Sequence, residues 1–287
     1  MSFRRPPDVI LLGICTEVFL LVNYTMSLNY HRLGHGPKIL LAFHGIGQTG
    51  LTCFESFSKQ LEDHYTIYAF DLFFHGQSKG IHGNDDFSEQ NILSKTLWKK
   101  LISDFLEENR IDRMDIAAFS MGGRFALATL EEFSNKIDNA FLIAPDGVSE
   151  HPLYTLASCF WPTRKLFHWV LQNPDTLIKS ANVFEKLGLI HKSLIRFTQF
   201  MLADPQRQET IYRSWLAFRM LKFDVPRIYQ KLNGTTVYLF IGKYDKLLKA
   251  KDVKKLSRLL PKEQYFLIPA GHGNLVEKAA DIIRKIV

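Results

Sequence analysis

RMDIAAFSMGGR, residues 113–124, ends a short apolar run with a serine and two glycines. The run before the serine has the composition of a buried parallel strand, and the apolar residues after the serine recur at helical spacing. A sharp turn between such a strand and a helix lifts a serine hydroxyl above the edge of a sheet. Crowding at that turn requires small neighbours such as Ala118 and Gly122. The stretch therefore nominates Ser120 as a nucleophile, with a plain turn or a helix N-cap as the alternative.

A serine hydroxyl is a poor nucleophile until a base takes its proton, and the base needs a carboxylate that sets its tautomer. His272 follows the last predicted strand and Asp245 follows the strand before it, so the chain order is serine, aspartate, histidine. We expect His272 to be the general base and Asp245 to orient it. Asp146 is the rival acid because it also follows a strand, and Asp252 is a weaker one. The non-catalytic alternatives are a solvated loop histidine and an aspartate that caps a turn.

Short apolar runs alternate with longer amphipathic stretches from residue 38 onward, which predicts parallel strands joined by crossover helices. The predicted strands are rich in β-branched or aromatic residues and cover Lys38–His44, Thr66–Asp71, Arg113–Phe119, Ala140–Pro145, Thr236–Gly242 and Gln264–Ile268. Helices are expected over Asn91–Arg110, with Ser88 before it, and over Met121–Phe133 and Asn274–Ile286. The predicted fold class is α/β.

Residues 149–231 interrupt this alternation, because they contain aromatic-rich helical patterns punctuated by five prolines. We expect a helical cap here, inserted between the core segments 26–148 and 232–287. Twelve lysines and arginines against six acidic residues give the cap +6 of the chain's net charge of +7. Such a surface would attract an anionic substrate or an acyl-carrier protein, and a solvated basic face is the alternative.

The aromatic residues of the cap have two interpretations. They either line an apolar acyl pocket or pack the cap helices on one another, and packing is favoured for most of them. The residues concerned are Phe160, Trp161, Phe167, Trp169, Phe197, Phe200, Trp215 and Phe218.

Acyl transfer also requires two donors for the oxyanion, and backbone N–H groups suit this role because they are fixed before the reaction. The loop HGIGQTG, residues 44–50, follows the first core strand, and its glycines permit close approach of the backbone. We expect the N–H groups of Ile46 and Met121 to form the oxyanion hole. A glycine-rich turn without a ligand is the alternative, and no GK[ST] follows to indicate a phosphate-binding loop.

The N-terminal residues 1–25 are predicted to be an extension or a first strand. Two arginines precede an apolar run, Val9–Val22, that is too short to span a bilayer comfortably. A strand around Glu17–Val22 that pairs with Ser27–Leu33 is favoured over an export signal. Met26 is an alternative start of the chain.

The composition of the 287 residues narrows the class of protein. A hydrophobic content of 46% supports one substantial core with an insertion. The three cysteines are widely spaced and contain no CxxC pair, which indicates neither a disulfide framework nor a zinc site and favours the cytoplasm. No nucleic-acid-binding motif accompanies the positive charge, so a nucleic-acid partner is not expected. We also expect no metal, no organic cofactor and no stable membrane span.

These motifs together resemble the α/β-hydrolase superfamily over residues 27–287. The resemblance rests on HG at 44–45, DLFFHGQS at 71–78, SMGG at 120–123, Asp245 and GH at 271–272. It implies an eight-stranded, mostly parallel sheet, a helical cap after the sixth strand, and a Ser/His/Asp triad beneath that cap. It also implies the oxyanion role given above to Ile46 and Met121.

Two residues depart from the family's usual pattern. Phe74 replaces the glycine usual before His75-Gly76, and Ala118 replaces the first glycine around the nucleophile. The run SMGGR at 120–124 resembles the SHCHC synthases, which use this fold for an elimination. His44 and His75 are interpreted as residues that shape loops.

Three functions are compatible with the sequence. The first is an esterase or thioesterase that acts on a small-molecule acyl substrate through an acyl-enzyme on Ser120. The second is a lyase or carbon–carbon hydrolase that uses the same triad. The third is a non-catalytic ligand-binding protein of this fold, which the complete triad disfavours.

Overall fold

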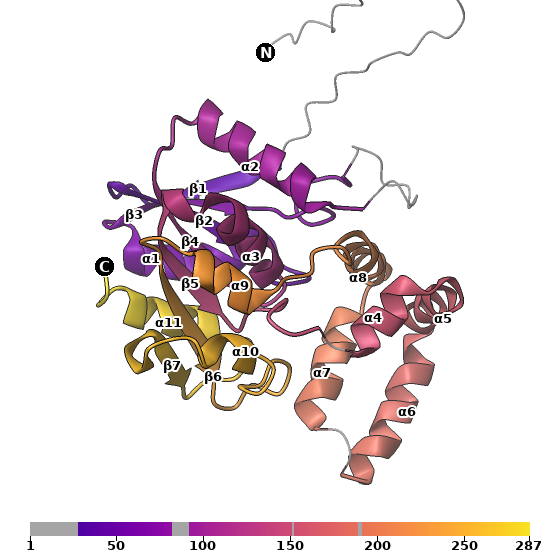
Figure 1. Ribbon diagram of the computed structural model, residues 1–287. Coiled ribbons are helices and arrows are strands. Elements are labelled where there is room, and N and C mark those ends of the chain that lie inside the picture. The colour runs from indigo at the N-terminus through magenta and orange to yellow at the C-terminus, as the bar shows by residue number, and fades with distance from the viewer. Residues whose placement is uncertain (1–27, 82–91, 151, 189–190) are drawn as a thin grey trace, which may run out of the picture.

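A seven-stranded sheet forms the centre of the computed structural model, which describes residues 28–81, 92–150, 152–188 and 191–287 (Figure 1). The strand order is β1-β3-β2-β4-β5-β6-β7; β1 is antiparallel to β3 and every other neighbouring pair is parallel. The strands are β1 (Tyr30–Leu33), β2 (Lys38–Phe43), β3 (Tyr65–Phe70), β4 (Met114–Phe119), β5 (Ile137–Ile143), β6 (Thr236–Gly242) and β7 (Tyr265–Ile268).

This sheet confirms the predicted α/β class, and each of the six predicted core strands appears with its ends shifted by at most three residues. Seven of the eight strands that the resemblance implied lie within the described residues. The segment Ser27–Leu33 contributes β1, which pairs with β3. Its predicted partner, Glu17–Val22, lies outside the described residues.

Helices cover both faces of the sheet, because alternate residues of each central strand point to opposite sides. In β2, Leu41 and Phe43 belong to one hydrophobic core, and Leu40 and Ala42 belong to the other. The helices of the first core are α2 (Lys95–Glu108), α3 (Gly122–Phe133), α9 (Val225–Lys231) and α10 (Lys254–Ser257). Those of the second are α1 (Gly50–Leu61) and α11 (Leu275–Ile283).

Short 3-10 turns precede two strands, η1 (Ser134–Lys136) before β5 and η2 (Lys262–Gln264) before β7. The predicted helices agree with α2, α3 and α11, although α2 begins later than expected. The Ser94 side chain accepts a hydrogen bond from the N–H of Leu97 and so caps α2 at its first turn.

Five helices between β5 and β6 form a lobe beside the sheet (Figure 1). They are α4 (Pro152–Cys159), α5 (Trp161–Gln172), α6 (Pro174–Lys186), α7 (Lys192–Met201) and α8 (Pro205–Ala217), and we call them the helical insertion. They pack around their own apolar cluster, which includes Leu171, Met201 and Ile211. The sixth helix of the predicted cap, α9, packs instead on α3 and α10 in the first core.

Arg124 joins the core to the helical insertion. Its guanidinium, in α3, is 2% exposed; Nε lies 2.6 Å from the Asp146 carboxylate and Nη1 lies 2.8 Å from Glu150. Nη1 also donates to the backbone oxygen of Leu221, and the group lies over the Tyr154 ring of α4. Burial disfavours the charged form, but the surrounding acidic groups outweigh it and raise the pKa of Arg124. The arginine is thus charged and fully engaged inside the protein.

Asp71, directly after β3, ties together three segments at the carboxyl end of the sheet. Its buried carboxylate accepts hydrogen bonds from the N–H groups of Gly50 and Gln77, at 2.9 and 3.0 Å, and from the Asn29 side chain at 2.9 Å. His31 lies 3.2 Å away. Burial by itself would raise the pKa of Asp71, but these donors outweigh it and the pKa is lowered. The carboxylate therefore stabilises the start of α1 and the loop that follows β3.

We predict that Asp71→Asn lowers the free energy of unfolding by about 1–3 kcal/mol at pH 7, because the buried N–H groups lose a charged acceptor. A carboxyl whose folded pKa is lowered stabilises the protein above its unfolded pKa, near 3.9, and loses that contribution as the pH falls through the folded pKa. The difference between the two proteins should therefore be constant from pH 7 to about 5 and shrink only below about pH 4. Urea unfolding across this range measures it, and equal stabilities at pH 7 would contradict the prediction.

Candidate active site

Ser120 occupies the sharp turn between β4 and α3. Its φ angle of 51° lies in the left-handed region, which is strained for a residue with a side chain. The turn is held by the Ser120 backbone, whose N–H donates to Ile143 at 3.1 Å and whose oxygen accepts from Gly123 and Asp146 at 2.8 Å. A Cβ on Gly122 would collide with the backbone oxygen of Phe43 in β2. Gly122 is therefore required because α3 begins in contact with the neighbouring strand, and a Cβ on Gly123 would collide with Pro145 and Asp146.

The structure brings Ser120, His272 and Asp245 together from the ends of three strands. His272 Nε2 lies 3.1 Å from Ser120 Oγ, and its Nδ1 lies 2.6 Å from Asp245 Oδ2. The other carboxylate oxygen of Asp245 accepts the N–H groups of Leu247 and Leu248. The Asp245 side chain is fully buried and that of His272 is 14% exposed. The hydrogen bonds define one orientation of the imidazole, with Nδ1–H toward the carboxylate and Nε2 toward the serine.

The two rival acids lie elsewhere. Asp146 binds the guanidinium of Arg124, and Asp252 accepts the N–H of Lys249 at 2.8 Å. Asp245 is thus the carboxylate that contacts His272 among the described residues. The ambiguity in the sequence arose because Asp146 and Asp245 both follow parallel strands; in the structure His272 contacts Asp245, whereas Arg124 binds Asp146.

His75 holds the loop after β2 in place. Its Nε2 accepts the N–H of Gly47 at 3.1 Å, and its Nδ1–H donates to the Phe73 oxygen at 2.9 Å. Both interactions are available together only to the neutral imidazole, and burial lowers the pKa of His75 to about 4. His75 is therefore a neutral acceptor at pH 7, with its tautomer set by its two partners.

His44 secures the same loop from its other side. Nδ1–H donates to the Gly45 oxygen at 2.6 Å and Nε2 accepts the N–H of Leu72 at 2.9 Å. Burial, with the neighbouring His75, lowers the pKa of His44 to about 3. The two rings meet edge to face with their centroids 4.9 Å apart. Both histidines thus shape loops, in agreement with the interpretation from the sequence.

The N–H groups of Ile46 and Met121 are close to Ser120 in the fold. Met121 follows the serine directly, and Ile46 lies in the loop after β2, the strand that pairs with β4. Neither N–H donates a hydrogen bond to another described residue. Donors that no protein group uses, at the edge where the serine emerges, fit the oxyanion role expected of them.

The helical insertion reaches this loop through α7 and α8. A Cβ on Gly47, whose φ is 73°, would lie 2.7 Å from Met201 Cε. The Ile46 side chain packs against the apolar cluster of the insertion, and Thr210 donates to the Phe74 oxygen at 3.4 Å. Nothing in the sequence singled out Met201, because its contact joins segments more than 150 positions apart.

The aromatic residues of the predicted cap divide into two groups. Phe167 and Trp215 stack with centroids 5.0 Å apart within the insertion, Phe197 packs against the same cluster, and Phe218 is buried in the first core. Four others are exposed and so do not pack the helices together: Phe160, Trp161, Trp169 and Phe200. The packing interpretation therefore holds for only part of the set.

The two departures from the family pattern have different consequences. Phe74 adopts a φ of 66°, where glycine is unstrained, and its side chain packs beside Phe218 at the base of the insertion. Ala118 is fully buried in β4 opposite Phe43. Neither change displaces the three side chains at the site.

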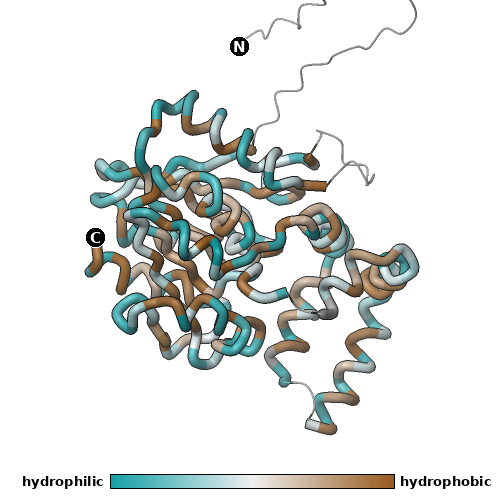
Figure 2. The backbone as a smooth tube through the Cα atoms, viewed as in Figure 1, coloured by the Kyte–Doolittle hydropathy of each residue, from teal (hydrophilic) through white to brown (hydrophobic). Residues whose placement is uncertain are grey.

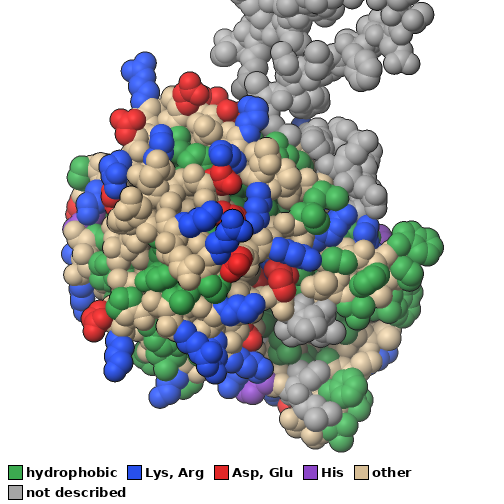
Figure 3. Space-filling model, viewed as in Figure 1, with side chains coloured by type: hydrophobic (Ala, Val, Ile, Leu, Met, Phe, Trp, Pro, Cys, Tyr) green, Lys and Arg blue, Asp and Glu red, His purple; other side chains and the backbone are tan. Residues whose placement is uncertain are grey.

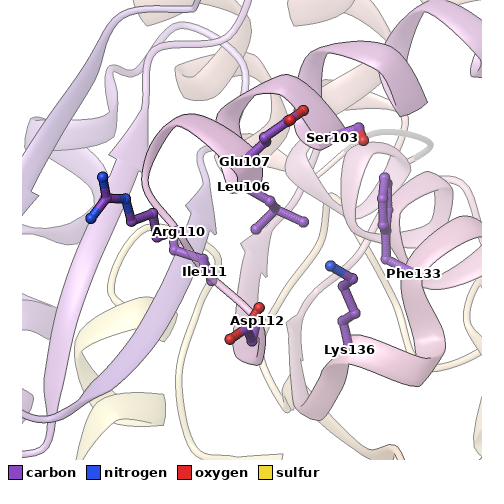
Figure 4. Close-up of a pocket in the computed structure, with 8 residues that line it drawn as sticks. All are labelled: Ser103, Leu106, Glu107, Arg110, Ile111, Asp112, Phe133 and Lys136. Carbon is purple, nitrogen blue, oxygen red and sulfur yellow. The ribbon is translucent and has the colours of Figure 1, made fainter.

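A separate pocket of about 470 Å³ lies at the opposite end of β4 (Figure 4). Its lining is the end of α2, the loop before β4 and the end of α3, with acidic Glu107 and Asp112 beside basic Arg110 and Lys136. None of the predicted site residues contributes to it. Among the described residues, no group of three or more His, Cys, Asp or Glu side chains is arranged to hold a metal.

Known proteins similar to this chain are consistent with its architecture. The sequence pattern of the family described as alpha/beta hydrolase fold matches residues 38–279. The uncharacterized proteins Rv2715 of Mycobacterium tuberculosis and Mb2734 of Mycobacterium bovis are each 30% identical over 117 residues, 41% of this chain. That match spans 31% of the length of either relative.

Solved structures with a similar fold cover nearly the whole chain. An esterase from Thermogutta terrifontis has a TM-score of 0.66 at 16% identity, over 90% of this chain and 92% of that one. A meta-cleavage product hydrolase from Pseudomonas fluorescens IP01 has a TM-score of 0.59 at 18% identity, with the same two coverages. An enol-lactonase from Burkholderia xenovorans LB400 has a TM-score of 0.62 at 13% identity, over 90% and 94%. With the sheet, the turn at Ser120 and a family match over most of the chain, this protein belongs to the alpha/beta hydrolase fold family.

Proposed function

We propose that this protein is a serine hydrolase that cleaves a carboxylic ester or thioester through an acyl-enzyme. The observation that carries the proposal is the continuous set of hydrogen bonds from Ser120 through His272 to Asp245, at 3.1 and 2.6 Å. A nucleophile, a base and a group that orients the base are the parts that acyl transfer requires.

In the proposed reaction, His272 Nε2 takes the proton of Ser120 as the serine oxygen attacks the carbonyl carbon of the substrate. Negative charge moves to the carbonyl oxygen, where the N–H groups of Ile46 and Met121 stabilise it. The C–O or C–S bond then breaks, and His272 returns the proton to the leaving alcohol or thiol. Water attacks the acyl-enzyme with His272 as base again, which releases the acid and restores Ser120. Asp245 stabilises the imidazolium of His272 during both formation and hydrolysis of the acyl-enzyme.

The same side chains also suit a lyase or a carbon–carbon hydrolase, and a solved structure of this fold is a meta-cleavage product hydrolase. An anionic substrate or acyl-carrier protein would be attracted to the exposed lysines of the helical insertion, whereas the buried Arg124 is already bound to Asp146 and Glu150 and is not available to it. Cys53 and Cys159 are free thiols, which supports a reducing compartment such as the cytoplasm.

The first test is covalent labelling of Ser120. We expect a fluorophosphonate probe to modify the folded wild-type protein and to leave Ser120→Ala unmodified, because the activated serine oxygen forms the new bond. Mass spectrometry of the labelled peptide locates the probe. Absence of labelling in the wild-type protein, with hydrolysis of a panel of esters and thioesters also absent, would favour the non-catalytic alternative. Product analysis on the same panel separates ester cleavage from carbon–carbon cleavage.

The second test separates the two aspartates. Asp245→Asn should lower kcat roughly 10³–10⁴-fold, because the amide no longer favours the reactive tautomer of His272. Asp146→Asn is the matched control and should lower kcat less than about tenfold, because Asp146 contacts Arg124 and not the base. A larger loss of kcat in Asp146→Asn than in Asp245→Asn would show that Asp146, and not Asp245, orients His272.

A third test addresses the loop that carries Ile46. His75→Phe removes the acceptor of the Gly47 N–H and should lower kcat roughly 10–100-fold, with little change in KM, because an oxyanion donor shifts. His75→Gln keeps an acceptor and should recover part of the loss. Thermal melts of both variants control for folding. If KM rises while kcat stays at the wild-type value, the loop contributes to substrate binding and the positioning role is refuted.

A further inference from the structure

Helix α5 turns an apolar side to solvent. Trp161, Leu166 and Trp169 are 64%, 58% and 52% exposed, and their spacing places them on one side of the helix with Lys165. The opposite side contributes Leu171 to the buried cluster of the insertion. A surface helix of a globular protein normally presents polar residues to solvent. The outer side of α5 therefore has a composition that the fold alone does not explain.

Neighbouring segments extend this surface. Leu156 and Phe160 are exposed where α4 meets α5, and Val183 and Leu187 are exposed near the end of α6. Nine of the fourteen exposed large hydrophobic side chains among the described residues lie between positions 156 and 200. Such concentration distinguishes a patch from the single exposed residues found on any protein. Figure 3 shows hydrophobic side chains on the side of the insertion turned away from the sheet, in one group over α5 and another toward the far end of α6, and hydrophobic residues recur along these helices in Figure 2.

Cations are interleaved with the exposed rings. Lys165 Nζ lies 4.2 Å from the centre of the Trp161 ring, and Arg207 lies 4.5 Å from that of Phe200. Residues 156–201 contain six lysines and arginines and two acidic residues, which leaves a net charge of +4. The surface is thus both apolar and positive.

We propose that this outer face of the helical insertion, residues 156–201, binds the surface of an anionic lipid bilayer. Tryptophan and phenylalanine beside lysine on a helix are typical of segments that lie in the headgroup region, where rings enter the apolar boundary and cations meet lipid phosphates. A second copy of this chain is a poorer partner, because two faces of +4 would repel each other. No helix in the described ranges is long and apolar enough to cross a membrane, so the attachment is peripheral.

Membrane binding would place the helical insertion between the lipid and the edge of the sheet that carries Ser120. The face and the site share the helical insertion, since α7 places Met201 against Gly47 in the loop beside Ser120. The inference itself rests on exposure and charge and is independent of the proposed reaction.

The test is flotation of the full chain with vesicles of phosphatidylcholine alone or mixed with roughly equal phosphatidylglycerol. We expect binding to the anionic vesicles that weakens with salt, and a blue shift of tryptophan fluorescence. The triple variant Trp161→Ser, Leu166→Ser, Trp169→Ser should bind at least about tenfold more weakly, because the buried apolar area is lost. The matched control, Leu51→Ser with Leu267→Ser, removes exposed apolar side chains from α1 and β7, outside the helical insertion, and should bind as the wild type does.

Charge is tested in a second pair of variants. Lys165→Glu, Lys179→Glu, Lys186→Glu should abolish most binding, whereas Lys251→Glu, Lys254→Glu, Lys255→Glu makes the same change in net charge on the core and should retain it. Circular dichroism melts and hydrolysis of a soluble ester check that each variant is folded, so a failure of the proposed reaction is distinguishable from a failure of membrane binding. Wild-type binding to an acidic acyl-carrier protein but not to vesicles would overturn the proposal. The proposal would also be overturned if light scattering showed a dimer that depends on the substituted residues while lipid binding is absent. Equal losses of vesicle binding in a variant and its matched control would overturn it as well.

Discussion

The left-handed turn at Ser120 is the constraint on which the rest of the site depends. A φ of 51° costs on the order of 1–3 kcal/mol, and it persists because the backbone around it is hydrogen bonded on both sides and because α3 starts against β2. Any side chain at Gly122 would push α3 away from Phe43. The same close approach places the Met121 N–H beside the serine. The strain at Ser120 and the placement of its side chain thus have one structural cause.

Two sets of fixed hydrogen bonds, one around Asp245 and one around His44 and His75, lie on either side of Ser120. Asp245 is held by two backbone donors before it meets His272, so the imidazole has a rigid partner. On the other side of the serine, buried His44 and His75 are kept neutral, since burial opposes their protonation, and each uses both ring nitrogens to hold backbone. In the proposed reaction, a loop held in this way would not need to reorganise when charge develops on a substrate oxygen.

The helical insertion has two kinds of surface, which differ in whether nearby acidic groups balance the positive charge. At its junction with the core, Arg124 is buried, and its charge is balanced by Asp146 and Glu150. On its outer side, basic residues are exposed among aromatic rings and have few acidic neighbours. The outer face, residues 156–201, carries +4 of the net charge of +6 in residues 149–231, whereas the buried arginine of α3 attaches the insertion to the core.

The sequence by itself determined the order of the strands along the chain, the turn at Ser120 and the position of His272 after the last strand, because strand periodicity and small residues at a crowded turn are local properties. It left Asp146 and Asp245 as rivals, since both follow parallel strands, and it placed α9 with the cap. Only the tertiary structure decided these points. Arg124 forms an ion pair with Asp146, and α9 packs on α3. Both are contacts between residues that are distant in the chain. The exposure of Trp161 and Trp169 was likewise invisible in the sequence, because an aromatic residue at helical spacing has the same pattern whether its side of the helix is covered or open.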